Sequence, residues 1–276
     1  MSKHFANHLS FRLQNHKQTE KFYGITAIEL NVTELCNRTC SFCPRHDPKV
    51  YPNQKLHMSL DTVYVLKKQL KGFLGQIQLC GFGEPTLNPN ILEICNILKE
   101  FNTEVVTNGD CFTKNKFTVD QLLHAGVDNI LISDYDKNPF FKELELRYEQ
   151  VKVRRHYDDG SDKYDEYNFT NRGGLMFEGY TDNPCYYPTY QVIIDWNGEL
   201  ILCCNDWLRK QKPFGNIHDN HILAIWNNEE YRNIRKNLLA GNRSLHDPCK
   251  SCSAKGTVMG EESAIYWKNK LENKID

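Results

Sequence analysis

Short runs of β-branched and aliphatic residues alternate with amphipathic stretches through the first half of the chain. The apolar runs predict strands, and apolar positions spaced three or four residues apart predict helices. The predicted strands are 25–32, 76–80, 104–107, 129–133 and 150–156, and the predicted helices are 59–73, 90–101, 118–125 and 140–147. Because strands that alternate with helices usually pair in parallel, the pattern predicts an α/β sheet, open or curved into a partial barrel.

The second half of the chain has a different pattern. Residues 157–174 are polar and contain glycine, which predicts a linker or an ordered functional loop. Two β-rich runs, 190–194 and 199–203, flank an Asn-Gly pair, and this arrangement predicts a hairpin. A helix is predicted at 221–240, with Gly241 as the residue that ends it.

These patterns divide the chain into three parts. The 276 residues suffice for one catalytic domain with its own core and a small additional module. We expect an N-terminal extension at 1–24, an α/β core at 25–170 and a small α+β C-terminal domain at 171–276.

The charge pattern narrows the choice of partners. The chain has 34 basic and 35 acidic residues, well interspersed, and a formal net charge of -1. This distribution gives no basic patch for nucleic acid or an anionic membrane. The sequence contains no run of about 18 apolar residues, which a membrane span would need, and no apolar N-terminal stretch of the kind found in a secretion signal. We therefore expect a cytoplasmic protein that acts on a small molecule, without nucleic-acid or membrane partners.

Eleven cysteines in a chain without a secretion signal point to metal binding rather than to disulfides, because the cytosol keeps thiols reduced. Seven of them form two spaced sets. The first cysteine set is Cys36, Cys40 and Cys43, and the second cysteine set is Cys185, Cys203, Cys249 and Cys252. The four others are expected to be buried small hydrophobic residues, and they are Cys80, Cys95, Cys111 and Cys204.

The first cysteine set has the spacing C-x3-C-x2-C and follows the first predicted strand. Three thiolates this close can bind one soft metal centre and leave a coordination position open for another ligand. Ligands bind at the carboxyl ends of parallel strands, so this position favours a reactive site. A structural zinc ion is the alternative, with His46 or His57 as its fourth ligand.

The segment ELCNRTCSFCP, with Phe42 before the third cysteine, resembles the cluster-binding loop of the radical S-adenosylmethionine (SAM) superfamily. The resemblance implies a partial (β/α)6-type barrel in which the first cysteine set holds a [4Fe–4S] cluster. It also implies that the amino and carboxylate groups of SAM chelate the unique iron. An electron donor of the flavodoxin or ferredoxin type is implied as well.

A second feature of that family follows the second predicted strand. The segment Gly81-Phe82-Gly83-Glu84-Pro85 resembles the GGEP motif that contacts the SAM amino group, with Phe82 in place of the second glycine. The resemblance assigns SAM contacts to Gly83, Glu84 and Pro85. Glu84 can accept hydrogen bonds from an ammonium group, and the glycines allow close approach of the backbone.

The next two strand ends also match the family in order. Thr107, Asn108 and Gly109 resemble the segment that contacts the ribose of SAM, and Ser133 ends the strand that follows. Each of these features is weak alone, since Asn-Gly is a common turn. Their order along successive strand ends supports a SAM site.

The second cysteine set has the spacing C-x17-C-x45-C-x2-C, and four thiolates can close a cluster or a tetrahedral zinc site. With Gly198, the GNI segment at 215–217 and the IWN segment at 225–227, it resembles the SPASM/twitch auxiliary domain. No cysteine follows Cys252, so the resemblance implies the shortened form with one auxiliary cluster. The family spacing from Gly198 selects Cys203 over Cys204 as the ligand.

The segment Thr170-Asn171-Arg172-Gly173-Gly174 adds a resemblance to the compact radical SAM dehydrogenases of aminoglycoside biosynthesis. That resemblance implies hydrogen abstraction from a carbinol carbon of a cyclitol or sugar alcohol, with an electron passing to the auxiliary cluster and a ketone as product. It places Arg172 at the substrate. A guanidinium is a poor base, so we expect Arg172 to orient the hydroxyl or stabilise an alkoxide.

Other readings of these residues stay open. The base or a substrate-amine contact could instead come from a group near the end of the core, namely His156, Tyr157, Asp158, Asp159 and Asp162. A radical SAM epimerase, or an enzyme that modifies a peptide or natural product, would use Cys204 or Cys80 as hydrogen donor. A binding protein with zinc at both cysteine sets is the non-enzymatic alternative.

Overall fold

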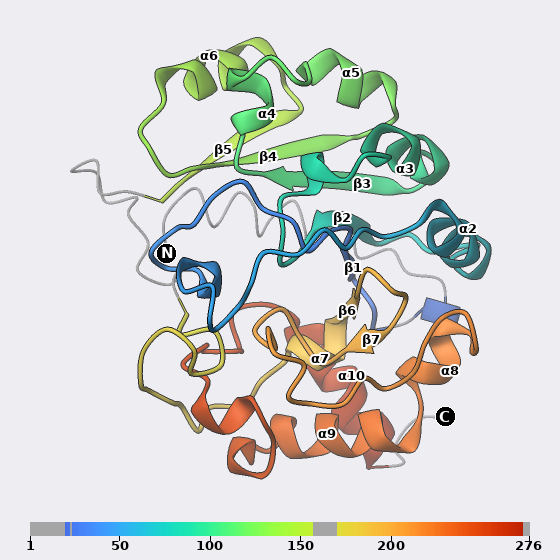
Figure 1. Cartoon of the computed structure of the whole chain (residues 1–276). Helices are drawn as coiled ribbons and strands as arrows, with labels where there is room; N and C mark the ends of the chain where they lie inside the picture. Colours follow the sequence, from blue (N-terminus) through green and yellow to red (C-terminus); the bar gives the residue numbers. More distant parts are fainter. Residues whose placement is uncertain (1–19, 23, 157–169, 273–276) are drawn as a thin grey trace.

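The computed structural model describes residues 20–22, 24–156 and 170–272. Within these residues, seven strands form one sheet in the order β5-β4-β3-β2-β1-β6-β7 (Figure 1). The strands of the first half are β1 (Ala27–Asn31), β2 (Gln76–Cys80), β3 (Asn102–Thr107), β4 (Asn129–Asp134) and β5 (Val151–Arg155). All neighbours in this half pair in parallel, so the predicted α/β class is confirmed.

The predicted hairpin is present and belongs to the same sheet. Strand β6 (Gln191–Ile194) pairs antiparallel with β7 (Leu200–Ile201). On its other side β6 pairs in parallel with β1, with Ala27 opposite Gln191. The C-terminal part of the chain therefore extends the sheet of the core, and the predicted domain limits stay a prediction.

Four helices of the first half follow the predicted order, and a fifth, the short α4, was not predicted. They are α2 (Leu60–Gln69), α3 (Ile91–Leu98), α4 (Asp110–Thr113), α5 (Val119–His124) and α6 (Pro139–Arg147). Local sequence fixes where they start: the Ser59 hydroxyl caps α2, and Thr118 with Gln121 forms a capping box at α5. Each cap satisfies backbone N–H groups that a helix start leaves without a partner.

The C-terminal part contains α7 (Tyr187–Tyr190), α8 (Ile222–Trp226), α9 (Glu229–Leu239) and α10 (Glu261–Leu271). The prediction of one continuous helix at 221–240 is wrong. Asn227 is the C-cap of α8. Asn228 has extended backbone angles, and its side chain accepts a hydrogen bond from Tyr231 N at 2.8 Å, so it caps the start of α9. Gly241, with a φ of 83°, follows α9 as predicted.

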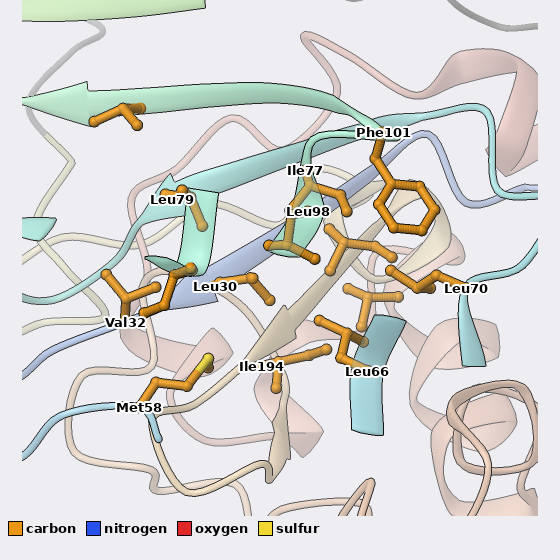
Figure 2. Close-up of a cluster of buried hydrophobic side chains, with 14 of the residues drawn as sticks. Leu30, Val32, Met58, Leu66, Leu70, Ile77, Leu79, Leu98, Phe101 and Ile194 are labelled. Atoms are coloured by element: carbon orange, nitrogen blue, oxygen red, sulfur yellow. The ribbon is translucent and has the colours of Figure 1, made fainter. Parts of the chain in front are cut away.

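The main hydrophobic core lies between the sheet and its helices, and it runs from the helices of the first half, part of which Figure 2 shows, to α8, α9 and α10. Leu30 of β1 and Leu79 of β2 pack there with Leu66 of α2, and all three side chains are at most 1% exposed. Successive side chains of a strand point to opposite faces of the sheet. Glu29 and Asn31 therefore point away from these helices, toward the face of the sheet that carries the candidate site. Among the described residues, no helix has both the length and the apolar character needed to cross a membrane.

Candidate active site

A cavity of about 270 Å³ lies at the carboxyl ends of the parallel strands. The loops after β1 and β2 and the ends of β3 and β4 form most of its wall, and Arg172, Cys204 and Trp207 of the C-terminal part complete it. This is the edge of a parallel sheet at which ligands usually bind. The predicted position of the site is therefore matched by a real cavity.

All three members of the first cysteine set line this cavity. Their loop is held by Asn53, whose side chain accepts a hydrogen bond from Cys36 N at 2.9 Å and donates one to Cys36 O at 2.8 Å. Burial raises the pKa of all three thiols, that of Cys40 to about 11. The thiols are thus protonated near neutral pH in the metal-free chain, and metal binding would release their protons. Three thiols facing one cavity fit a cluster with one iron open to a small ligand.

Buried charged side chains hold the cysteine loop in place. Arg45, two residues after Cys43, forms a salt bridge with Glu34 at 2.9 Å, and both side chains are 2% exposed. Arg45 Nε also donates to the carbonyl of Phe82 at 2.8 Å, and the Tyr51 hydroxyl donates to Glu34 at 2.7 Å. The cysteine loop and the Gly-Phe-Gly-Glu-Pro segment are therefore fixed to each other. No sequence pattern predicts this network, because ordinary charged residues in a loop are usually exposed.

A second arginine reaches the same carboxylate from the C-terminal part. Arg209 forms salt bridges with Glu34 and with Asp195, the latter at 2.7 Å. Its guanidinium also lies 4.4 Å from the ring centre of Phe82. The side chains of Arg209 and Glu34 come from sequence positions 175 residues apart. Spacing within the sequence cannot reveal such a pair.

The Gly-Phe-Gly-Glu-Pro segment passes very close to the start of the cysteine loop. A methyl group on Gly83 would lie 2.2 Å from Thr33 O and 2.7 Å from Leu35 O, so glycine is required there. Phe82 lines the cavity and packs in a cluster with Trp207, their ring centres 4.8 Å apart. Pro85 begins a short 3₁₀ helix, η3 (Pro85–Leu87), and does not line the cavity. The phenylalanine at the second glycine position is thus accommodated by packing.

Glu84 lines the cavity, but the chain itself uses its carboxylate. Oε1 accepts hydrogen bonds from the hydroxyls of Thr86 at 2.7 Å and Thr107 at 2.6 Å, and Oε2 accepts one from Asn108 N at 2.8 Å. Burial raises the pKa of Glu84, and these hydrogen bonds oppose the rise. The carboxylate therefore joins the end of β2 to the end of β3. Its contact with the ammonium group of SAM stays a prediction.

The predicted ribose-contacting segment is tied to the cysteine loop. Asn108 Nδ2 donates to Asn37 Oδ1 at 2.9 Å, and both Thr107 and Asn108 line the cavity. Gly109 does not line it; its φ is 77°, and a methyl group there would lie 2.5 Å from the Phe141 ring. The requirement for glycine at 109 is thus explained by packing. Ser133 lines the cavity at the end of β4.

Aromatic rings form another part of the wall. Phe42 and Tyr135 lie 5.1 Å apart between ring centres, and Tyr135 stacks on His156 at 4.9 Å. Burial, together with the charges of Arg154 and Arg172, lowers the pKa of His156 to about 2. A group that resists protonation so strongly is a poor base near neutral pH. The other candidates near the end of the core, Tyr157, Asp158, Asp159 and Asp162, lie outside the described residues.

Arg172 lies on the cavity wall, and the loop that carries it is attached to the second cysteine set. Asn171 is fully buried; its backbone N–H donates to Ser253 Oγ at 2.9 Å, and its Nδ2 donates to Ser251 O at 2.8 Å. A methyl group on Gly173 would lie 2.7 Å from Pro248. Arg172 itself has a φ of 50°, and its buried Nε has no hydrogen-bond partner among the described residues. A strained backbone with an unpaired buried donor is typical of a functional position.

The four remaining cysteines separate into two pairs. Cys80 and Cys204 line the cavity, so the structure brings both candidate hydrogen donors to the site. Cys95 and Cys111 are at most 4% exposed and belong to the hydrophobic core, as predicted.

The second cysteine set lies away from this cavity but forms a group of its own. Burial raises the pKa of Cys185 to about 11, and the charge of Cys252 adds to the rise. The pKa of Cys203 is raised by burial and then by its cysteine neighbours, and that of Cys249 by burial and then by Cys185 and Cys252. Cys249 and Cys252 are buried, Cys185 and Cys203 are half-buried, and four such thiols that influence one another are a donor set suited to an iron–sulfur cluster.

Single metal ions demand a tighter arrangement, with sulfur ligands at about 2.3 Å from zinc. Across the part of the chain that the structure describes, no three His, Cys, Asp or Glu side chains are grouped closely enough to hold one ion. Each thiolate of an iron–sulfur cluster binds a different iron, so a wider spacing suits it. Metal content is the direct test between the two.

Comparison with known proteins identifies both parts of the site. The model of the radical SAM superfamily matches residues 30–133, and that of SPASM, an iron–sulfur cluster-binding domain, matches residues 185–253. The first match contains the first cysteine set and the SAM motifs, and the second contains the second cysteine set.

Individual relatives cover almost the whole chain. An S-adenosyl-L-methionine-dependent 2-deoxy-scyllo-inosamine dehydrogenase from Niallia circulans is 26% identical over 249 residues, 87% of this chain and 96% of that protein. The structure of BtrN in complex with AdoMet and 2-DOIA has a TM-score of 0.69 at 25% identity, over 83% of this chain and 93% of BtrN. BtrN in an open conformation has a TM-score of 0.61 at 21% identity, over 85% and 98% of the two chains, and shows the same fold.

The predicted cofactors agree with these matches. A radical SAM domain requires SAM and a [4Fe–4S] cluster, and a SPASM domain binds auxiliary iron–sulfur clusters. The donor sets described above fit both groups. The chain therefore contains a radical SAM domain and a SPASM-type iron–sulfur cluster-binding domain, and it is a radical SAM enzyme.

Proposed function

We propose that this enzyme is a dehydrogenase that oxidises a carbinol carbon of a small hydroxylated ring, a cyclitol or sugar alcohol, to a ketone. The observation that carries the proposal is the position of Arg172. It projects into the cavity that the first cysteine set lines, on a loop that hydrogen bonds to the segment of the second cysteine set. A substrate beside Arg172 would have access to both clusters. The relative from Niallia circulans is named as a dehydrogenase of an aminocyclitol, which agrees with this substrate class.

In this proposal each cysteine set holds one [4Fe–4S] cluster. The first cysteine set holds the cluster that binds SAM, with SAM itself along the predicted contacts that line the cavity, namely Phe42, Gly83, Glu84, Thr107, Asn108 and Ser133. The second cysteine set holds the auxiliary cluster. When bound, SAM and its cluster supply a 5′-deoxyadenosyl radical that removes a hydrogen atom, and the auxiliary cluster takes up the second electron of the oxidation.

The chain supplies positioning and charge. Arg172 orients the substrate hydroxyl and stabilises it as it loses its proton, because its guanidinium stays charged and offers several donors. Glu29 and Gln78 project from β1 and β2 into the same cavity and suit hydroxyl or amine groups of a ring. Gln191 Nε2 donates to Glu29 at 2.8 Å and fixes its carboxylate. The aromatic wall of Phe42 and Tyr135 limits access of water to the reacting carbon.

Epimerisation is the second candidate, because Cys80 and Cys204 both line the cavity. An epimerase returns a hydrogen atom to the substrate radical from such a thiol and produces no ketone. The two reactions therefore differ in product mass: a dehydrogenase product is two hydrogens lighter than its substrate, whereas an epimer has the same mass.

The electron donor and the compartment follow from the same chemistry. We infer a flavodoxin- or ferredoxin-type protein as the source of the electron that starts SAM cleavage. A cytoplasmic location suits the chain, because oxygen-sensitive clusters and the thiols that bind them need a reducing compartment.

Anaerobic reconstitution tests the proposal in two stages. Two [4Fe–4S] clusters require about eight irons, and a Cys36/Cys40/Cys43→Ala variant should keep about four and cleave no SAM. Zinc in place of iron, or fully loaded protein that cleaves no SAM, would contradict the enzyme assignment.

In the second stage, cyclitols and sugar alcohols deuterated at the carbinol carbons are screened with the loaded enzyme. Dehydrogenation predicts deuterium in 5′-deoxyadenosine together with a ketone. R172M should lose ketone formation, whereas R172K should retain part of it, and both should still cleave SAM. With unlabelled substrate in D2O, a product one mass unit heavier and no ketone would favour the epimerase, and loss of that product in C204A or C80A would identify the donor.

A further inference from the structure

Arg243 is a buried cation without an acidic partner among the described residues. The residue is 2% exposed and begins a short 3₁₀ helix, η5 (Arg243–Leu245). Throughout residues 20–22, 24–156 and 170–272, no carboxylate forms a salt bridge with it. Burying an unpaired charge is costly, so such a residue needs a compensating role.

The guanidinium donates all its hydrogen bonds to backbone carbonyls. Nε donates to Asn183 O at 2.7 Å and Nη1 to Ala254 O at 2.8 Å. Nη2 donates to Pro184 O and to Lys255 O, both at 3.2 Å. These bonds satisfy the donors and leave the positive charge without a counter-ion.

The four carbonyl groups belong to residues that stand just before the first and just after the last cysteine of the second cysteine set. Asn183 and Pro184 immediately precede Cys185, and Ala254 and Lys255 follow Cys252. One side chain therefore ties the segment before the first thiol to the segment after the last thiol. The position of Cys185 relative to Cys252 depends on these bonds.

The charge also lies close to a thiol. A methyl group on Gly256 would lie 2.5 Å from Arg243 Nη2 and 3.0 Å from Cys185 Sγ. The distance between Arg243 Nη2 and Cys185 Sγ therefore cannot exceed the sum of these two distances. Gly256 has a φ of 76°, which suits glycine. Burial raises the pKa of both Cys185 and Cys249, and the charge of Arg243 opposes the rise.

A cation in this place acts on the charge of a bound cluster. A [4Fe–4S] cluster with four thiolates is negatively charged, and each electron that it accepts makes it more negative. A nearby buried cation stabilises the more negative state, and low solvent access keeps this effect strong. The expected result is a higher reduction potential.

We propose that Arg243 is a positioning residue of the auxiliary cluster and that its charge raises the reduction potential of that cluster, which suits it to accept the electron from the substrate. The inference rests on the proposed assignment of the second cysteine set to an auxiliary cluster. It adds a residue that selects the direction of electron flow without touching the substrate.

Lys250 provides a matched comparison. It lies between Cys249 and Cys252 in the sequence, yet its side chain is 53% exposed and pairs with Asp247 at 2.9 Å. Water and this carboxylate screen its charge. If proximity in the sequence were decisive, removal of Lys250 would have the larger effect; if burial is decisive, removal of Arg243 will.

The test uses the full chain with both clusters loaded and no substrate. Iron content is measured for wild type, R243K, R243Q and K250M, and each cluster is titrated by electron paramagnetic resonance at controlled potentials. Added SAM changes the signal of the SAM-binding cluster, which identifies the auxiliary one. In R243Q the equilibrium constant for reduction of the auxiliary cluster should fall at least about tenfold, which lowers the reduction potential by about 59 mV for one electron. R243K should retain most of the wild-type potential, and K250M should change it less than about threefold.

Each outcome has a defined meaning. Equal auxiliary potentials in R243K and R243Q at equal iron content would overturn the inference. Loss of auxiliary iron from R243Q alone would support a role for the charge, whereas loss from both variants would show that only the carbonyl contacts matter. A wild-type chain with one cluster, or with zinc, would instead overturn the proposed function, whatever the variants do.

Discussion

Arg209 forms a salt bridge with Glu34 and so joins the two parts of the chain that match separate family models. Glu34 lies two residues before Cys36, and its side chain is 2% exposed. Arg209 has a φ of 48°, an unfavourable value for a residue other than glycine. Such strain persists only where surrounding contacts hold it, so this pair is a fixed joint between the SAM-binding loop and the C-terminal part.

Replacing Arg209 should loosen that joint. R209M leaves the buried carboxylate of Glu34 with fewer cationic partners and removes the salt bridge to Asp195. We expect the free energy of unfolding to fall by about 3 kcal/mol, the lower end for a broken buried pair, because Arg209 is partly exposed. Denaturant unfolding under anaerobic conditions measures it. K236M removes an exposed lysine from α9 and should cost less than about 0.5 kcal/mol; equal losses in the two variants would contradict the prediction.

Replacing Glu84 should weaken SAM binding. In E84Q the amide NH2 would face either the Asn108 N–H or the threonine hydroxyls, since both carboxylate oxygens now accept hydrogen bonds. The ends of β2 and β3 would separate, and we expect the dissociation constant for SAM to rise at least about tenfold, or about 1.4 kcal/mol. Equilibrium binding to the loaded enzyme measures it. T86V, which removes one donor to Glu84, should have a smaller effect, and an unchanged affinity in E84Q would contradict this role.

Gly83 offers a test in which the two clusters report separately. In G83A the new methyl group would press on the carbonyls of Thr33 and Leu35, which are backbone atoms and cannot rotate away. The cysteine loop must then shift, and about four of about eight irons should be lost while the auxiliary cluster stays. Iron content with SAM cleavage measures this. Retention of all the iron with normal SAM cleavage would contradict the prediction and show that the cysteine loop tolerates the methyl group.

His156 should make stability depend on pH. An unfolded histidine takes up a proton near pH 6.5, whereas burial and two nearby arginines keep folded His156 neutral at far lower pH, with a pKa of about 2. Below pH 6.5 the unfolded state therefore binds more protons, and the free energy of unfolding falls as pH falls. H156Q should make the decline between pH 6.5 and 5 shallower, by up to about 1.4 kcal/mol per pH unit. Identical slopes for H156Q and wild type in urea unfolding would contradict this assignment.

The sequence predicts those features that depend on neighbouring residues. The parallel strands, the hairpin around Asn197-Gly198 and the gathering of strand-end residues at one cavity all follow from local patterns. The break at Asn228 was missed, because the apolar spacing continues through it and only the capping bond of its side chain reveals the new helix. The Arg209–Glu34 pair was beyond reach for another reason: it depends on how two distant segments fold together.

The bonds of Asn171 carry a consequence for the working enzyme. They attach the Arg172 loop to Ser251 and Ser253, on either side of Cys252. In a chain that has acquired only its first cluster, the Arg172 loop would not be held in position, and the enzyme would cleave SAM without binding its substrate. The fraction of SAM cleavage events that lead to product would then depend on the iron supply. When iron is scarce, SAM would be cleaved without product before turnover stops.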